Sequence, residues 1–221
     1  MKKKFDAPEA AVWVAALLPF ALTAAVYAHL PPQIPVHWGI SGAIDAYGPK
    51  AAAWLFPVLA FLVAALLKWM PRLDPKRESY AKFKTGYRAF RLVFALFFLV
   101  MTATTLYAAF APAALPVGRI ITLCLGAVFC VLGNYMPKFR HNYFCGMRTP
   151  WTLASEEVWV ATHRMAGPLW FVGGLALMAA ALLPLSQSVL FVIVMALVFL
   201  FTLVPCVYSY FLYQKTQKPS K

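Results

Sequence analysis

The stretch AAAWLFPVLAFLVAALLKWM, residues 51–70, decides the fold class of this chain. Apart from Lys68 near its end, the stretch carries no charged residue. A helix that crosses a bilayer needs about 20 mostly apolar residues, because the hydrocarbon core is about 30 Å thick. Residues 51–70 are therefore expected to form a membrane-spanning helix.

Similar apolar runs lie on both sides of this one along the chain. The predicted spans are residues 10–30, 51–70, 92–111, 120–136, 168–183 and 189–213. Each must be helical, because an unpaired backbone polar group cannot face lipid. Charged residues make up 12% of the chain, about half the share in soluble domains. We therefore predict an all-α, polytopic membrane protein with six transmembrane helices in a single domain, residues 1–221.

The basic residues orient these spans. With the N-terminus in the cytoplasm, both termini and the loops at 71–87 and 137–167 lie inside, and the loop at 31–50 lies outside. Of the 20 lysine and arginine residues, only Lys50 and Arg119 then fall outside. Contact with anionic lipid accounts for the net charge of +13 without a nucleic-acid partner.

The outer loop at 31–50 is polar and rich in proline and glycine, which predicts defined turns and excludes a long helix. His37 and Asp45 in this loop are able to bind a metal, transfer a proton or hold the loop by hydrogen bonds. Two isolated titratable groups without a third ligand do not make a metal site. We predict neither a metal nor a cofactor.

The inner loop at 71–87 predicts a surface helix that Asp74 caps, with Pro75 at its first position, and that runs into the third span. Its basic face suits either lipid headgroups or a cytosolic partner.

The inner loop at 137–167 is the longest. Its first part is irregular, and its second part predicts an amphipathic helix in the membrane interface, capped by Thr152 or Ser155 and anchored by Trp151 and Trp159. Glu156 and His163 share a helical face, as an acid–base pair would require. No nucleophile elbow or metal-spaced cluster accompanies them, so catalysis is left open and is not favoured.

The arrangement of the loops carries two further predictions. Each half of the chain has a long loop after its first helix, one outside and one inside, which fits an inverted 3+3 repeat. No charged residue lies in the middle of a predicted span, which argues against a proton- or sodium-coupled pump.

Three loop sequences together resemble SdpI-like bacterial membrane proteins, including their N-terminal domain of unknown function. The sequences are LPPQIPVHWGISGAIDAYGPK (30–50), PRLDPKRESYAKF (71–83) and GNYMPKFRHNYFCGMRTPWTLASEEVWVATHR (133–164). The resemblance implies a multi-pass protein of the bacterial plasma membrane that protects its cell from a secreted, membrane-active toxin peptide. It also implies, for some members, recruitment of a small cytosolic repressor that makes the protein a sensor.

The resemblance and the loop chemistry together select two groups of candidate residues. The toxin-facing candidates are His37, Asp45, Tyr47 and Lys50. The cytoplasmic motif candidates are Asn134, Asn142, Arg148, Thr149, Trp151, Thr152, Glu156, Trp159, His163 and Arg164. Two alternatives stay open: a membrane-embedded enzyme acting on lipid or peptide, and a small exporter or flippase.

Overall fold

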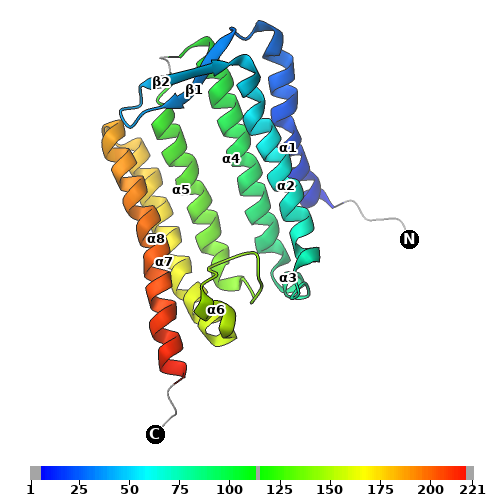
Figure 1. Ribbon diagram of the computed structural model, residues 1–221, viewed down its shortest axis with the longest axis vertical. Coiled ribbons are helices and arrows are strands. Elements are labelled where there is room, and N and C mark those ends of the chain that lie inside the picture. The colour runs from blue at the N-terminus through cyan, green and yellow to red at the C-terminus, as the bar shows by residue number, and fades with distance from the viewer. Residues whose placement is uncertain (1–5, 113–114, 218–221) are drawn as a thin grey trace, which may run out of the picture.

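The computed structural model describes residues 6–112 and 115–217, and it is an all-α membrane fold (Figure 1). Within these residues, six helices are long and apolar enough to cross a membrane, as the sequence predicted. They are α1 (Ala7–Val26), α2 (Leu55–Leu73), α4 (Lys84–Phe110), α5 (Val117–Tyr135), α7 (Glu156–Leu182) and α8 (Gln187–Thr216). The protein is therefore a multi-pass membrane protein. Of the basic residues that oriented the prediction, Lys2, Lys3, Lys4, Lys218 and Lys221 lie outside the described residues.

Shorter elements lie at the two ends of the helix bundle (Figure 1). At the hairpin end are η1 (Tyr27–His29), β1 (Gln33–Trp38), β2 (Ile44–Pro49) and η2 (Lys50–Trp54). At the opposite end, which we call the basic end, are α3 (Ser79–Lys82), η3 (Met136–Lys138) and α6 (Pro150–Ala154).

The six helices form two groups of three. Helices α1, α2 and α4 pack together, as do α5, α7 and α8, and α4 meets α5 between the groups. The tightest pair is α5 with α7, where glycines from the two helices face each other. A Cβ added at Gly133 would lie 2.4 Å from the Phe171 backbone nitrogen, and one at Gly174 would lie 2.7 Å from the Gly126 carbonyl oxygen. Small residues allow membrane helices to approach this closely.

The loop at 31–50 forms a structure that was not predicted, an antiparallel β-hairpin of β1 and β2. Gly42 lies in its turn with φ +83°, a conformation that glycine adopts without strain. The pairing is irregular between Pro35 and Trp38, where the register shifts. The hairpin closes one end of the bundle across both groups of helices (Figure 1).

The prediction of a separate interfacial helix in the loop 137–167 is wrong. Helix α7 runs without a break from Glu156 to Leu182, through Pro168, and Ser155 caps it. Trp159 is fully buried and does not anchor at headgroups, because its indole N–H donates to the Phe139 carbonyl oxygen of the folded-back loop.

The prediction of a surface helix at 71–87 that starts at Asp74 is also wrong. Asp74 begins a turn instead, and only the short α3 precedes α4, which starts at Lys84. Asp74 is buried, because its carboxylate binds groups from the loop that follows α5. Helix α4 therefore includes Arg88 and Arg91, which the predicted span from residue 92 left outside.

Candidate functional site

The loop between α5 and α6 folds back over the start of α7, and Asn142 organises it. The Asn142 side chain is fully buried and uses both its oxygen and its nitrogen. Its Oδ1 accepts hydrogen bonds from the Cys145 and Phe144 backbone nitrogens and lies 3.1 Å from the Tyr80 hydroxyl. Its Nδ2 donates to the carbonyl oxygens of Arg140 and Cys145. Asn142 therefore acts as the centre of this loop.

Asp74 and Tyr80 join this loop to the segment before α4. The Tyr80 hydroxyl donates to Asp74 Oδ2 at 2.9 Å, and the Tyr143 backbone nitrogen donates to the same oxygen at 2.9 Å. Burial, followed by the hydrogen bond to Asp74, raises the pKa of Tyr80 well above its usual value. The hydroxyl therefore stays protonated and keeps its role as a donor.

Trp159 and His163 form the floor under this loop. Their rings stack with centroids 4.1 Å apart. His163 Nε2 accepts from the Met147 backbone nitrogen at 2.9 Å, which requires the proton to be on Nδ1, 2.8 Å from the Trp159 carbonyl oxygen. Gly146 passes close above with φ +116°, and a Cβ there would lie 2.3 Å from His163 Nε2. His163 is thus a neutral ring that both of its hydrogen bonds hold in place.

Thr149 and Thr152 form a capping box at the start of α6, in which each threonine hydroxyl accepts from the other residue's backbone nitrogen. The Thr149 hydroxyl also lies 3.0 Å from the Ser209 hydroxyl of α8. Trp151 packs edge-on against Tyr210 of the same helix. Thr149 and Trp151 therefore fasten α6 to α8.

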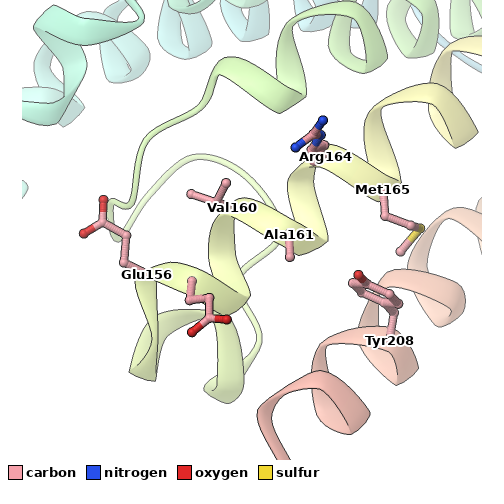
Figure 2. A pocket seen from close by; sticks show the side chains of 7 residues that line it. Glu156, Val160, Ala161, Arg164, Met165 and Tyr208 are labelled. Carbon is pink, nitrogen blue, oxygen red and sulfur yellow. The ribbon is translucent and has the colours of Figure 1, made fainter. Parts of the chain in front are cut away.

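The remaining motif candidates lie at the surface. Asn134 and Arg148 are exposed, and Arg148 donates to the Tyr143 carbonyl oxygen at 3.2 Å. Glu156 and Arg164 line an open groove of about 580 Å³ between α7 and α8, with Tyr208 on the facing helix (Figure 2). The structure therefore separates exposed Glu156 from buried His163 and does not pair them.

His141 and Cys145 are both buried within the loop. His141 Nδ1 lies 2.7 Å from Lys76 Nζ, and burial, together with this ammonium group, lowers the pKa of His141. Burial raises the pKa of the Cys145 thiol to about 12, so the thiol carries no charge near neutral pH. Within the part of the chain that the structure describes, no group of three metal-ligating side chains comes together.

At the hairpin end, the structure brings two of the toxin-facing candidates together. His37 Nδ1 and Asp45 Oδ1 lie 2.6 Å apart, and both side chains are exposed. Tyr47 lies farther along β2 and is exposed, whereas Lys50 Nζ lies 4.9 Å from the centre of the Tyr27 ring. The exposed His37–Asp45 pair is the polar feature that the hairpin presents.

Beneath this pair lies a cavity of about 790 Å³ between the hairpin and the ends of α5 and α8. Its lining is mostly apolar, with a few polar groups, which is typical of binding cavities. The residues that line it include His37, Asp45, Gly118, Thr122, Gln187 and Phe191. A neighbouring cavity of about 320 Å³ shares His37 and Trp38 and extends toward α2 and α4.

Gln187 also lines this cavity and was not among the predicted site residues. Its Oε1 is buried and has no hydrogen-bond partner among the described residues. A Cβ at Gly118 would lie 2.2 Å from this oxygen, and one at Gly42 would lie 2.7 Å from Gln187 Cγ. Gln187 thus contacts both the hairpin turn and α5. One sequence feature could have indicated Gln187: it is a polar residue directly after Ser186, the cap at the start of α8.

Comparisons with known proteins match both the N-terminal and the C-terminal parts of the sequence. The chain matches the model of the SdpI/YfhL protein family over residues 138–209 and that of a domain of unknown function, DUF1648, over residues 14–61. It is 25% identical to "Immunity protein SdpI" of Bacillus subtilis (strain 168), over 90% of this chain and 92% of the relative. No solved structure matches it. The predicted resemblance to SdpI-like proteins is confirmed.

Proposed function

We propose that this multi-pass membrane protein, whose resemblance to SdpI-like proteins is confirmed, is an immunity protein that protects its cell from a secreted, membrane-active toxin peptide. The similarity to an immunity protein over 90% of the chain carries this proposal, because a match of that length is not confined to one helix or one loop. A local match to one loop would support much less.

The cavity beneath the hairpin is the proposed contact site for the toxin. Its volume of about 790 Å³ lies within the usual range for small-molecule sites, so it can admit a few side chains of a peptide but not a folded domain. The His37–Asp45 pair at its rim offers a carboxylate to a cationic group. The apolar walls from α5 and α8 suit the hydrophobic side chains of a membrane-active peptide.

This proposal requires the hairpin to face the exterior and the basic end to face the cytoplasm. The distribution of lysine and arginine supports that orientation. In variants without the native cysteines, an impermeant thiol reagent applied to intact cells should label Ser41→Cys in the hairpin turn but not Ser79→Cys in α3. Labelling of the Ser79→Cys variant in intact cells would contradict this orientation and place the basic end outside the cell.

The test of function is survival of sensitive cells that express this chain during exposure to a secreted membrane-active peptide. Expression should raise the concentration of peptide that kills half of the cells. The control is the Gly118→Leu variant, in which the new side chain would occupy the space of Gln187 and part of the cavity. Protection that persists in a stably inserted Gly118→Leu variant would place recognition elsewhere in the molecule.

We further propose that the groove of Figure 2 receives a small cytosolic repressor when the protein acts as a sensor. The exposed charges of Glu156, Glu157 and Arg164 around apolar Val160 and Met165 support a protein partner there. Arg164→Glu should reduce co-purification of a candidate repressor without reducing survival. If survival falls in parallel, the groove serves immunity itself.

A further inference from the structure

Another cavity, which is rich in positive charge, lies at the basic end, where the start of α4 meets α1 and the last turns of α2. We call it the basic cleft. It has a volume of about 290 Å³. The charged residues that line it are Glu9, Lys68, Arg72, Lys84, Arg88 and Arg91. It lies on the helix group away from the groove of Figure 2, and the proposed immunity function makes no use of it.

The carboxylates near the basic cleft leave it with an excess of positive charge. Glu9 Oε1 accepts from Lys68 Nζ at 2.7 Å, and Glu9 Oε2 accepts from Arg91 Nη1 at 2.7 Å. Arg88 pairs with Asp6 outside the cleft lining. Two carboxylates therefore face five basic side chains, which favours an anionic ligand.

Arg91 supplies an independent indication of a ligand. Its side chain is 3% exposed, and it lines the cleft. Only Nη1 has a partner, whereas Nε and Nη2 are buried without any hydrogen-bond acceptor among the described residues. A buried donor without an acceptor is costly, and for a charged group the cost is greater. An anionic oxygen in the cleft would remove that cost.

The position of the cleft indicates where such an anion comes from. Lys68 and Arg72 lie in the last turns of α2, and Lys84 starts α4, so the cleft lies where two membrane-crossing helices end. The Arg72 guanidinium also lies 4.2 Å from the centre of the Trp69 ring, and tryptophan is enriched at the headgroup level of membranes. We therefore expect the cleft to open near the depth of the lipid phosphates.

We propose that the basic cleft binds a phosphate group, which the headgroup of an acidic phospholipid supplies in the membrane. Guanidinium groups bind phosphate through paired, charge-assisted hydrogen bonds, and lysine adds a point charge. Arg91 donates from the floor of the cleft, and Arg72 and Lys84 donate from its exposed rim. Basic pockets between membrane helices bind lipid headgroups in this way.

The test uses the full chain in a neutral detergent, with its thermal midpoint as the measure of binding. Dihexanoyl phosphatidylglycerol, dihexanoyl phosphatidylcholine and inorganic phosphate are titrated separately at constant ionic strength. Phosphatidylglycerol should raise the midpoint in a saturable way, and phosphatidylcholine should not. Saturation by inorganic phosphate at the same concentrations would still support a phosphate site, with a soluble anion as its ligand.

A matched pair of double variants locates the site. The first double variant, Arg72→Gln with Lys84→Gln, removes two positive charges from the rim of the cleft. The second, Arg77→Gln with Lys82→Gln, removes two positive charges from exposed positions outside the cleft. Each basic residue at a lipid surface contributes about 1 kcal/mol, so the first pair should weaken binding about thirtyfold. The second pair should weaken it less than about threefold. Equal weakening by both pairs, or no saturable response in the parent, would overturn the proposal.

Discussion

Two pairs of polar residues, one at each end of the bundle, are used in opposite ways. At the basic end, Asn142 and His163 are fully buried and use every polar side-chain atom in hydrogen bonds. At the hairpin end, His37 and Asp45 are exposed above a cavity and contact each other. Residues of the first kind determine whether the fold forms, whereas residues of the second kind are free to meet a ligand. A motif that stands out in the sequence can therefore be structural.

The largest expected effect comes from Asn142→Leu. The change leaves the Cys145 and Phe144 backbone nitrogens without their acceptor in a buried loop. We expect a loss of about 3 kcal/mol or more in the free energy of unfolding, measured as a lower thermal midpoint and less protein in the membrane fraction. Asn134→Leu is the control, because Asn134 is exposed. Equal losses in both variants would remove the distinction between buried and exposed motif residues.

Gly146→Ala should have the next largest effect. Its φ of +116° disfavours any other residue, and the added Cβ would lie 2.3 Å from His163 Nε2. We expect destabilisation of about 2 kcal/mol, again measured by the thermal midpoint. Gly39→Ala at the hairpin end should cost less, because its nearest neighbour is the movable Asp45 carboxylate at 3.0 Å. A larger effect of Gly39→Ala would mean that the hairpin is the more rigid end.

Acid should weaken the basic end through His141. Because burial and Lys76 lower the pKa of His141 below 6.5, the unfolded chain binds more protons than the folded protein as the pH falls below 6.5. Stability is then lost toward low pH, by at most about 1.4 kcal/mol for each pH unit. Glu156 and Asp74 oppose this shift only in part.

The measurement for this pH effect is the thermal midpoint between pH 7.5 and pH 5. His141→Gln should flatten the pH dependence, whereas Asn134→Leu, which changes no titratable group, should leave its slope unchanged. A thermal midpoint of the unmodified protein that rises from pH 7.5 to pH 5 would contradict the expected loss of stability in acid.

The smallest expected effect concerns recognition. Asp45→Asn should reduce protection against a cationic peptide by less than about 1 kcal/mol, which is about fivefold in peptide concentration. The reduction should be greater at low salt, and the thermal midpoint should not change. His37→Gln and the double variant complete a cycle that measures whether the pair acts as a unit. If the thermal midpoint falls together with protection, the pair holds the hairpin and does not contact the peptide.

The sequence predicted the membrane fold because that prediction depends on local composition. Residues 51–70 and the other apolar runs have to form helices in lipid, whatever surrounds them. The same local reasoning named hydrogen bonds that hold the loop as one role for His37 and Asp45, and the structure places the two side chains 2.6 Å apart. The helix limits were less accurate: the predicted fifth span began at residue 168, whereas α7 begins at Glu156. A charged, amphipathic first turn looks the same in sequence whether it lies at an interface or continues into a span.

By itself, the sequence determined that six helices cross a membrane, because runs of about 20 apolar residues have the length of a spanning helix, which pairs its own backbone in lipid. Only the tertiary structure decided that Trp159 is a buried floor residue and that Gln187 borders the hairpin cavity. It also decided that Arg91 lies buried beside Glu9, a residue 82 positions earlier. Periodicity gives the face of a helix on which a side chain lies. What covers that face depends on segments distant in the chain, which meet only when the helices pack.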